Sequence, residues 1–310
     1  MITRAIQALQ INSLKGRLVI GLCLTLFFIH GSYANDPYDR DTAIIGIMSR
    51  LMYSTNSIDT RIATEMIFLD LMKNIGKKGV FIDINSPQDA IQDMRQHRLD
   101  ALLTNTLDYL EIDHMINPSH RYSVVIGPNK LQNIILLTRR SDKIKNLAQL
   151  RQKRLTHPTG FDLGLLFLDV SLMTQGLPVA ERFFSTSTVV PDINTAIIDL
   201  FFNKADAALV TDASFNLASE LNTQITHQLE VLIASEPMVP MVIGVNKSVP
   251  SNFTRQVDQM MARLDEYPKT IHLLSLFKAK GMVKITDQDL HSARVLKQEY
   301  EELISANSGE

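Results

Sequence analysis

The chain has 310 residues, with 31 Lys and Arg against 33 Asp and Glu and a formal net charge of −2. This slightly acidic balance argues against a protein that binds nucleic acid through a basic surface. The hydrophobic content of 45% is ordinary for a globular core, and a single cysteine excludes a fold held together by disulfides.

The N-terminal segment has the order of a secretory signal peptide. A basic start precedes the apolar run LVIGLCLTLFFI at residues 18–29, and small residues occupy the positions that a signal peptidase reads. We expect residues 1–34 to be cleaved near Ala34. Because that segment carries three cations and no acidic residue, the periplasmic product would have 276 residues and a net charge of −5.

Two other roles for this segment stay open. The apolar run could be a membrane anchor, although a span needs about 20 apolar residues. Cys23 could be a lipid attachment site, although Leu22 stands where a small residue is expected. The signal peptide is the interpretation that fits the whole segment.

The rest of the chain alternates short β-rich runs with helical patterns, which indicates parallel sheets covered by helices. Its most informative feature is an internal repeat. Residues 90–103 (AIQDMRQHRLDALL) and 196–209 (AIIDLFFNKADAAL) align without a gap at an offset of 106. Each copy predicts a helix, a polar turn and a buried strand that begins Asp-Ala. A chance match between amphipathic helices is the alternative, but a further helical pattern follows each copy, and we expect two Rossmann-like α/β lobes.

The ends of the predicted strands indicate where a ligand would bind. In open parallel sheets, ligands bind beyond the carboxyl ends of the strands, where helix N-termini present free N–H groups. The two copies of the repeat end in Thr104-Asn105-Thr106 and in Thr211-Asp212. If the lobes face each other, these turns line the cleft between them.

Two extended runs predict crossovers between the lobes: QNIILLT at residues 132–138 and MVPMVIGV at residues 238–245. The first lobe would then be discontinuous, with residues 35–138 and 237–310, and C-terminal helices would close it. The second lobe would hold residues 139–236. Hinged closure of two such lobes around a solute is a known mode of ligand capture.

Several segments, in their order along the chain, resemble the phosphate-, phosphite- and phosphonate-type periplasmic binding proteins of ABC importers. They are residues 44–47 (IIGI), 90–109, 139–142 (RRSD), 145–150 (KNLAQL), 157–160 (HPTG), 161–174 and Gly176. The resemblance covers most of the chain after residue 34. It implies a type II periplasmic binding protein fold, in which two α/β lobes joined by two crossover hinges capture a small polar, phosphonate- or phosphate-like ligand.

One segment departs from that family's pattern. Phosphonate and phosphate binders are typically rich in Ser and Thr where this chain has Thr159-Gly160-Phe161-Asp162. An ionised Asp162 accepts hydrogen bonds only and repels a phosphate at close range. Two interpretations stay open. Asp162 caps its helix, or the chain binds a different solute, including one whose amino group an acidic residue would hold.

The candidate ligand-binding residues follow predicted strands or belong to the departing segment. They are Ser49, Arg50, Tyr53, Thr104, Asn105, Thr106, Thr159, Phe161, Asp162 and Asp212. An ordinary turn, cap or surface role is the alternative for each. The sequence has no nucleophile elbow, phosphate-binding glycine loop or H-E-x-x-H helix, and its scattered histidines have no metal-ligand spacing. We therefore expect no catalytic residue, metal or cofactor.

These observations predict a monomeric, non-enzymatic periplasmic protein that serves an inner-membrane ABC permease or a membrane sensor. One alternative is a regulatory protein whose surface binds a protein partner. Another is an enzyme on the same fold, which the export signal argues against because such enzymes are cytoplasmic.

Overall fold

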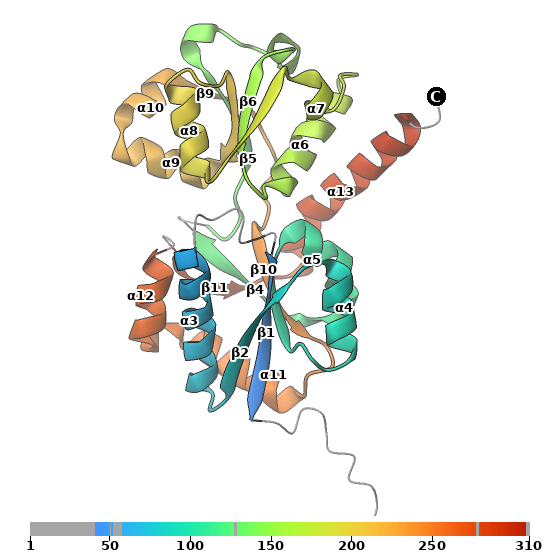
Figure 1. The fold of residues 1–310 in the computed structure, drawn as a ribbon, viewed down its shortest axis with the longest axis vertical. Coiled ribbons are helices and arrows are strands. Elements are labelled where there is room, and N and C mark those ends of the chain that lie inside the picture. The colour runs from blue at the N-terminus through green and yellow to red at the C-terminus, as the bar shows by residue number, and fades with distance from the viewer. Residues whose placement is uncertain (1–40, 50, 52–57, 127–128, 277–278, 308–310) are drawn as a thin grey trace, which may run out of the picture. The chain divides into compact units, whose positions relative to one another are not determined.

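The computed structural model describes residues 41–49, 51, 58–126, 129–276 and 279–307. The expected signal peptide lies outside them. The described strands form two mixed sheets, and helices cover both faces of each sheet (Figure 1).

The first sheet contains six described strands, and five helices belong to it. The strands are β1 (Thr42–Met48), β2 (Lys78–Ile84), β3 (Ala101–Asn105), β4 (Ile116–Ile126), β10 (Met241–Asn246) and β11 (Ala279–Lys284). The helices are α3 (Ile58–Asn74), α4 (Pro87–Arg95), α5 (Thr106–Ile112), α11 (Ser251–Ala262) and α12 (Pro268–Leu276). The strand order is β11-β4-β10-β3-β1-β2. β1 runs parallel to β2 and β3, whereas β10 runs antiparallel to β3 and β4.

The second sheet contains five described strands, and five further helices surround it. The strands are β5 (Ile134–Arg139), β6 (Arg154–Pro158), β7 (Thr186–Val190), β8 (Ala207–Thr211) and β9 (Leu229–Ala234). The helices are α6 (Asp162–Met173), α7 (Ala180–Phe183), α8 (Ile193–Phe201), α9 (Asp212–Leu221) and α10 (Thr223–Gln228). The order β7-β6-β8-β5-β9 matches that of the first sheet without its edge strand β11. In each sheet the strand that follows a crossing, β10 in the first and β5 in the second, lies antiparallel beside the repeat strand.

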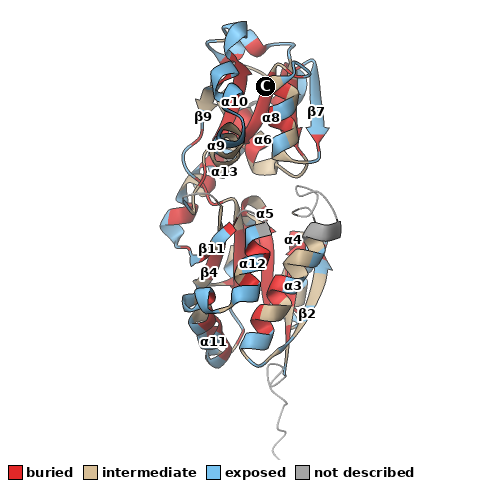
Figure 2. Ribbon diagram, turned by 90° about the vertical axis from the view of Figure 1, so that its left-hand side faces the viewer, coloured by how far each residue is buried: buried red, intermediate tan, exposed pale blue. Residues whose placement is uncertain are grey.

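The buried residues concentrate in the strands and on the sheet-facing sides of the helices (Figure 2). One apolar cluster lies against α4 and α5 in the first unit. The second sheet has a cluster on each face, one against α8 and α9 and one against α6. Each α/β unit therefore has its own core, as two packed layers of secondary structure require.

The structure confirms the helix, turn and strand predicted for both copies of the repeat. α4 and β3 form the first copy, and α8 and β8 form the second. The turns match in backbone conformation, since His97 and Asn203, which are 106 residues apart, both have positive φ, of 56° and 62°. The helix caps match as well, because Ser86 caps α4 and Asp192 caps α8.

The aspartate that opens each repeat strand has the same structural role in both units. The Asp100 carboxylate accepts a hydrogen bond of 2.7 Å from the Ile44 amide, at the start of β1. The Asp206 carboxylate accepts one of 3.0 Å from the Arg154 amide, at the start of β6. In both units this contact holds the repeat strand beside its parallel neighbour, β1 in the first sheet and β6 in the second.

Two features differ from the expected organisation. The apolar run at residues 132–138, expected to be a crossover, supplies β5, a fully buried strand of the second sheet that begins at Ile134. That sheet therefore starts before residue 139. In addition, the C-terminal helix α13 (Asp287–Asn307) packs against α6 of the second unit instead of only closing the first.

Candidate functional site

The end of β3 and the first residue of α5 hold three of the predicted ligand residues, and two of them have structural partners. Asn105 caps α5, with its side chain accepting a hydrogen bond of 2.8 Å from the Asp108 amide. The Thr106 hydroxyl is buried and donates to the Val239 carbonyl oxygen. The Thr104 hydroxyl is fully buried and has no hydrogen-bond partner among the residues that the structure describes. Thr104 is thus the one of the three whose hydroxyl is left for another group.

Asp212, after β8, anchors the chain where it crosses between the sheets. Its Oδ1 atom accepts hydrogen bonds from the backbone amides of Asn133, at 3.0 Å, and Ala213, at 2.7 Å. The Asn133 side chain in turn donates to the Ser235 carbonyl oxygen at 2.6 Å, in the return crossing. Beside this contact, the backbones of Gln132 and Met238 exchange hydrogen bonds of 2.9 and 2.8 Å.

Thr106 and Asp212 occupy equivalent positions in the repeat, 106 residues apart, each at the first residue of a helix. Each fixes one crossing segment, Thr106 through Val239 and Asp212 through Asn133. The pair therefore holds the two crossings to the helices that flank the strand ends.

The turn between β6 and α6 has a different character. Thr159 is tied to the neighbouring strand end, because its amide and hydroxyl both donate to the Val190 carbonyl oxygen, at 2.9 and 3.2 Å. Gly160 follows with φ of +67°. Phe161 precedes the helix without a side-chain cap, and its ring packs over Gly164 and against the core. Phe161 thus fills the first turn of the helix with apolar surface.

α6, which follows the parallel strand β6, begins without a side-chain cap, as does α11 after the antiparallel strand β10. Ser86, Asn105, Asp192 and Thr211 cap α4, α5, α8 and α9 with hydrogen bonds to the backbone. No such bond occurs in α6, and Asp162, its first residue, makes no side-chain hydrogen bond with any described residue. The interpretation of Asp162 as a cap is therefore wrong. The first amides of α6, with the positive end of the helix dipole, are available to an anion.

His157 lies at the end of β6, immediately before this turn. It is buried, and its Nδ1 atom is 3.1 Å from the Pro158 carbonyl oxygen. Burial lowers the pKa of His157 below its ordinary value, and the Asp162 charge opposes that shift only in part. The imidazole is therefore neutral at pH 7 and adds no positive charge to the start of α6.

The remaining predicted residues follow β1. The Ser49 hydroxyl donates a hydrogen bond of 3.2 Å to Asn85 Oδ1, which joins the residues after the parallel strands β1 and β2. Arg50 and Tyr53 lie outside the described residues. Sequence reasoning missed Asn85, although it directly follows β2 and the rule that ligands bind beyond strand ends applies to it.

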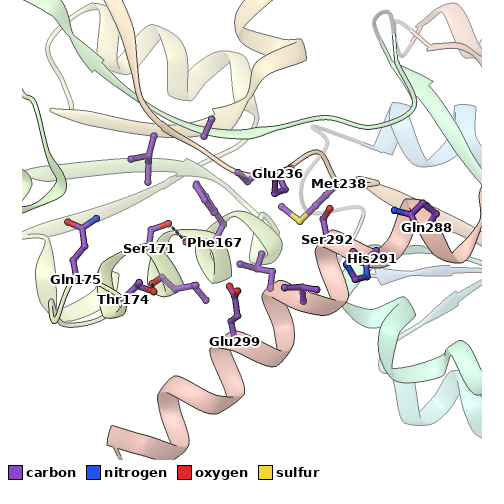
Figure 3. Close-up of a pocket in the computed structure, with 16 residues that line it drawn as sticks. Phe167, Ser171, Thr174, Gln175, Glu236, Met238, Gln288, His291, Ser292 and Glu299 are labelled. Carbon is purple, nitrogen blue, oxygen red and sulfur yellow. Dashed lines mark hydrogen bonds between the residues drawn. The ribbon is translucent and has the colours of Figure 1, made fainter.

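A cavity of about 760 Å³ lies elsewhere, between α6, α13, the end of β9 and the return crossing (Figure 3). Phe167, Met238 and Leu296 contribute its apolar lining, and Ser171, Glu236 and Glu299 are among its polar residues. None of the predicted ligand residues that the structure describes lines it. The described residues contain no group of three or more His, Cys, Asp or Glu side chains that could hold a metal ion.

The two α/β units have matching strand orders, and each contains one antiparallel strand that directly follows a crossing. This arrangement defines a type II periplasmic binding protein fold. The family model described as "ABC transporter, phosphonate, periplasmic substrate-binding protein" matches residues 54–290. The chain belongs to this family. It is a periplasmic-type substrate-binding component of ABC uptake systems, a family that binds small ligands and works with a membrane permease rather than as an enzyme.

Solved structures share this fold at low sequence identity. The Prochlorococcus marinus protein PhnD1, in complex with methylphosphonate, is 14% identical, with a TM-score of 0.60 over 86% of this chain and 99% of that one. The binding protein component of a Pseudomonas aeruginosa ABC phosphonate transporter is 13% identical, with a TM-score of 0.60 over 87% and 89%. XAC2383 from Xanthomonas citri, bound to chloride, is 14% identical, with a TM-score of 0.62 over 86% and 99%. No curated protein matches the chain.

Within the described residues, no helix combines the length and apolar character that crossing a bilayer requires.

Proposed function

We propose that this chain captures a small zwitterionic ligand whose anionic group binds the N-terminus of α6. The observation that carries the proposal is the missing cap of α6 after the parallel strand β6, since α4, α5, α8 and α9, which follow the parallel strands β2, β3, β7 and β8, have side-chain caps at their first amides. A helix N-terminus with free amides is a ready anion site. The methylphosphonate complex of a protein with the same fold supports a phosphorus oxyanion as that group.

Asp162 supports an ammonium group at the other end of the ligand. Its carboxylate is the first side chain of α6 and has no hydrogen-bond partner among the described residues. A ligand that carried only negative charge would meet this carboxylate at close range, whereas a ligand with an amino group would pair with it. Neutral His157 offers no competing cation nearby. An aminoalkylphosphonate combines both groups.

The remaining predicted residues fit the opposite wall of the site. Ser49 follows β1, and Thr104 is the next-to-last residue of β3. The contact of α5 with α6 supports a site between the two sets of strand ends. The paired crossings at Gln132 and Met238 would act as the hinge. Ligand capture then needs no chemistry, only a higher affinity of the ligand for the closed state.

We further propose that residues 1–34 direct the chain to the periplasm and are removed near Ala34. The released protein, residues 35–310, would act as a monomer and deliver its ligand to an inner-membrane ABC permease. Its acidic net charge argues against a nucleic-acid partner.

The experiment is a thermal-shift screen of residues 35–310 against 2-aminoethylphosphonate, methylphosphonate, phosphate, sulfate and ethanolamine. A ligand at one hundred times its Kd adds about 2.7 kcal/mol to the free energy of unfolding. We expect 2-aminoethylphosphonate to give the largest shift and ethanolamine none, because the anionic group makes the α6 contacts. A shift with ethanolamine alone, or no shift with any phosphorus oxyanion, would overturn the proposal.

A further inference from the structure

The first turns of α13 are tied to the first α/β unit by three ion pairs. Arg121 on β4 is buried and donates a hydrogen bond of 2.8 Å to Asp287, the first residue of α13. Lys130 lies 2.8 Å from Asp289, and Asp113, just after α5, lies 2.6 Å from Arg294. We call these three pairs the anchor.

The same helix is buried further along against the second unit. Ala293 is fully buried and Leu296 is 8% exposed, and both belong to the apolar cluster formed with Phe167, Leu168 and Leu172 of α6. Tyr300 and Leu303 extend this contact along α13. We call this apolar contact between α13 and α6 the seat (Figure 3).

Because α13 contacts elements of both sheets, it is a third link between the units besides the two crossings. A hinge movement about the crossings changes the position of β4 relative to α6, so α13 cannot keep the anchor and the seat unchanged. We infer that α13 is a strap that limits the hinge and has to move on α6 when the protein closes. This inference rests on the hinged capture proposed above.

The strap yields at the seat rather than at the anchor. The seat is bordered by the cavity of about 760 Å³, and polar side chains such as Ser171 and Ser292 line that cavity, so the seat is not closely packed along this edge (Figure 3). The anchor includes the buried Arg121 guanidinium, which also donates to the Tyr109 hydroxyl and the Pro118 carbonyl oxygen. Separating it would leave a buried charge without its acid, and that is strongly unfavourable.

The test measures the distance between the units directly, in the absence of any ligand. Spin labels are placed on exposed positions of α4 and α9 through Gln92→Cys and Asn216→Cys in residues 35–310, a range without native cysteine. Double electron–electron resonance then reports the distance distribution. The variant Leu296→Ala weakens the seat, and Leu200→Ala is the matched control, because Leu200 is fully buried in the cluster on the other face of the second sheet.

We expect a single narrow distribution for the labelled parent and for Leu200→Ala. Leu296→Ala should broaden it and add a second population at a shifted distance. Leu303→Ala, at a partly buried position of the seat, is the milder variant to use if Leu296→Ala does not fold. A folded seat variant with the parent distribution would overturn the inference. Because no ligand is used, that result would leave the proposed function untouched, and a failed ligand screen would leave this result standing.

Discussion

Asp206 is held by hydrogen bonds from two guanidinium groups and one backbone amide. Arg154 donates to it from Nε at 3.0 Å and from Nη2 at 2.9 Å, and Arg139 Nη2 donates at 3.0 Å. The Arg154 contact is the largest influence on this carboxyl, and it holds the pKa of Asp206 far below the ordinary value. These bonds join the start of β6, the end of β5 and the start of β8, so a single side chain fixes three strands.

Replacing Asp206 with Asn should lower the free energy of unfolding at pH 7 by about 1.5–3 kcal/mol, the range for a hydrogen bond to a charged group. A lowered carboxyl pKa stabilises the fold above the unfolded pKa of about 3.9, and this stabilisation is lost as the pH falls toward the folded pKa. The gap between wild type and Asp206→Asn should therefore narrow below about pH 4. Urea unfolding at pH 7 and pH 3.5 measures the difference in free energy of unfolding between the two proteins. A difference that did not change with pH would contradict the assignment.

His157 should make the free energy of unfolding fall at acidic pH, because its pKa differs between the folded and unfolded chain. Its folded pKa is lowered by burial, so the unfolded chain binds a proton near pH 6.5 that the folded chain does not. Stability from this residue is present above about pH 6.5 and is lost as the pH falls toward the folded pKa. His157→Asn, which keeps a donor for the Pro158 carbonyl oxygen, should lose less stability than wild type between pH 7.5 and 5.5 in chemical denaturation. An equal loss in both proteins would rule this out.

The first turn of α6 combines an apolar ring with a glycine that makes room for it. A Cβ atom on Gly164 would lie 2.4 Å from two ring atoms of Phe161, closer than van der Waals contact allows. This explains how a bulky residue stands where the family pattern has small donors. It also leaves the helix amides without a cap.

Gly164→Ala should therefore change the free energy of unfolding in the direction opposite to that of most Gly-to-Ala substitutions in helices. Replacing Gly by Ala inside a helix normally stabilises by about 0.5–1 kcal/mol. Here we expect destabilisation, because the new methyl group meets the Phe161 ring. Phe161→Ala in the same chain should restore the usual gain, and a double-mutant cycle of thermal melts measures the coupling. Additive effects of the two substitutions would contradict the packing described here.

Local signals in the sequence predicted the elements well. The repeat predicted α4 with β3 and α8 with β8, because the hydrophobic spacing that defines these elements acts within a few residues. The place of β5 could not be predicted in this way. Its apolar run has no alternation and fits the centre of either sheet equally well, so only the pairing with β8 decides it.

The candidate site was predicted less completely, since hydrogen-bond partners far away in sequence decide what a polar residue does. Thr106 bonds a carbonyl 133 residues away and Asp212 an amide 79 residues away, and these contacts make them anchors of the crossings instead of free ligand groups. By contrast, the strand-end rule selected Thr104 and the departure from the family's pattern selected Asp162, and the structure leaves both without a side-chain partner among the described residues.

The molecule as a whole repeats one α/β design twice within a single chain. Both units use the same turn conformation, the same aspartate contact and the same cap positions within the repeat. The two crossings, with α13 beside them, link the units, as the proposed capture requires.

Isothermal titration of 2-aminoethylphosphonate and methylphosphonate into residues 35–310 and into Asp162→Asn tests most directly whether α6 binds a zwitterion. Wild type should bind 2-aminoethylphosphonate more tightly. Asp162→Asn should weaken that binding roughly tenfold, about 1.4 kcal/mol, and should strengthen methylphosphonate binding, because it removes an attraction for the ammonium group and a repulsion of the phosphonate. Unchanged Kd values for both ligands in Asp162→Asn, or a preference of wild type for methylphosphonate, would contradict the assignment of the site to the start of α6.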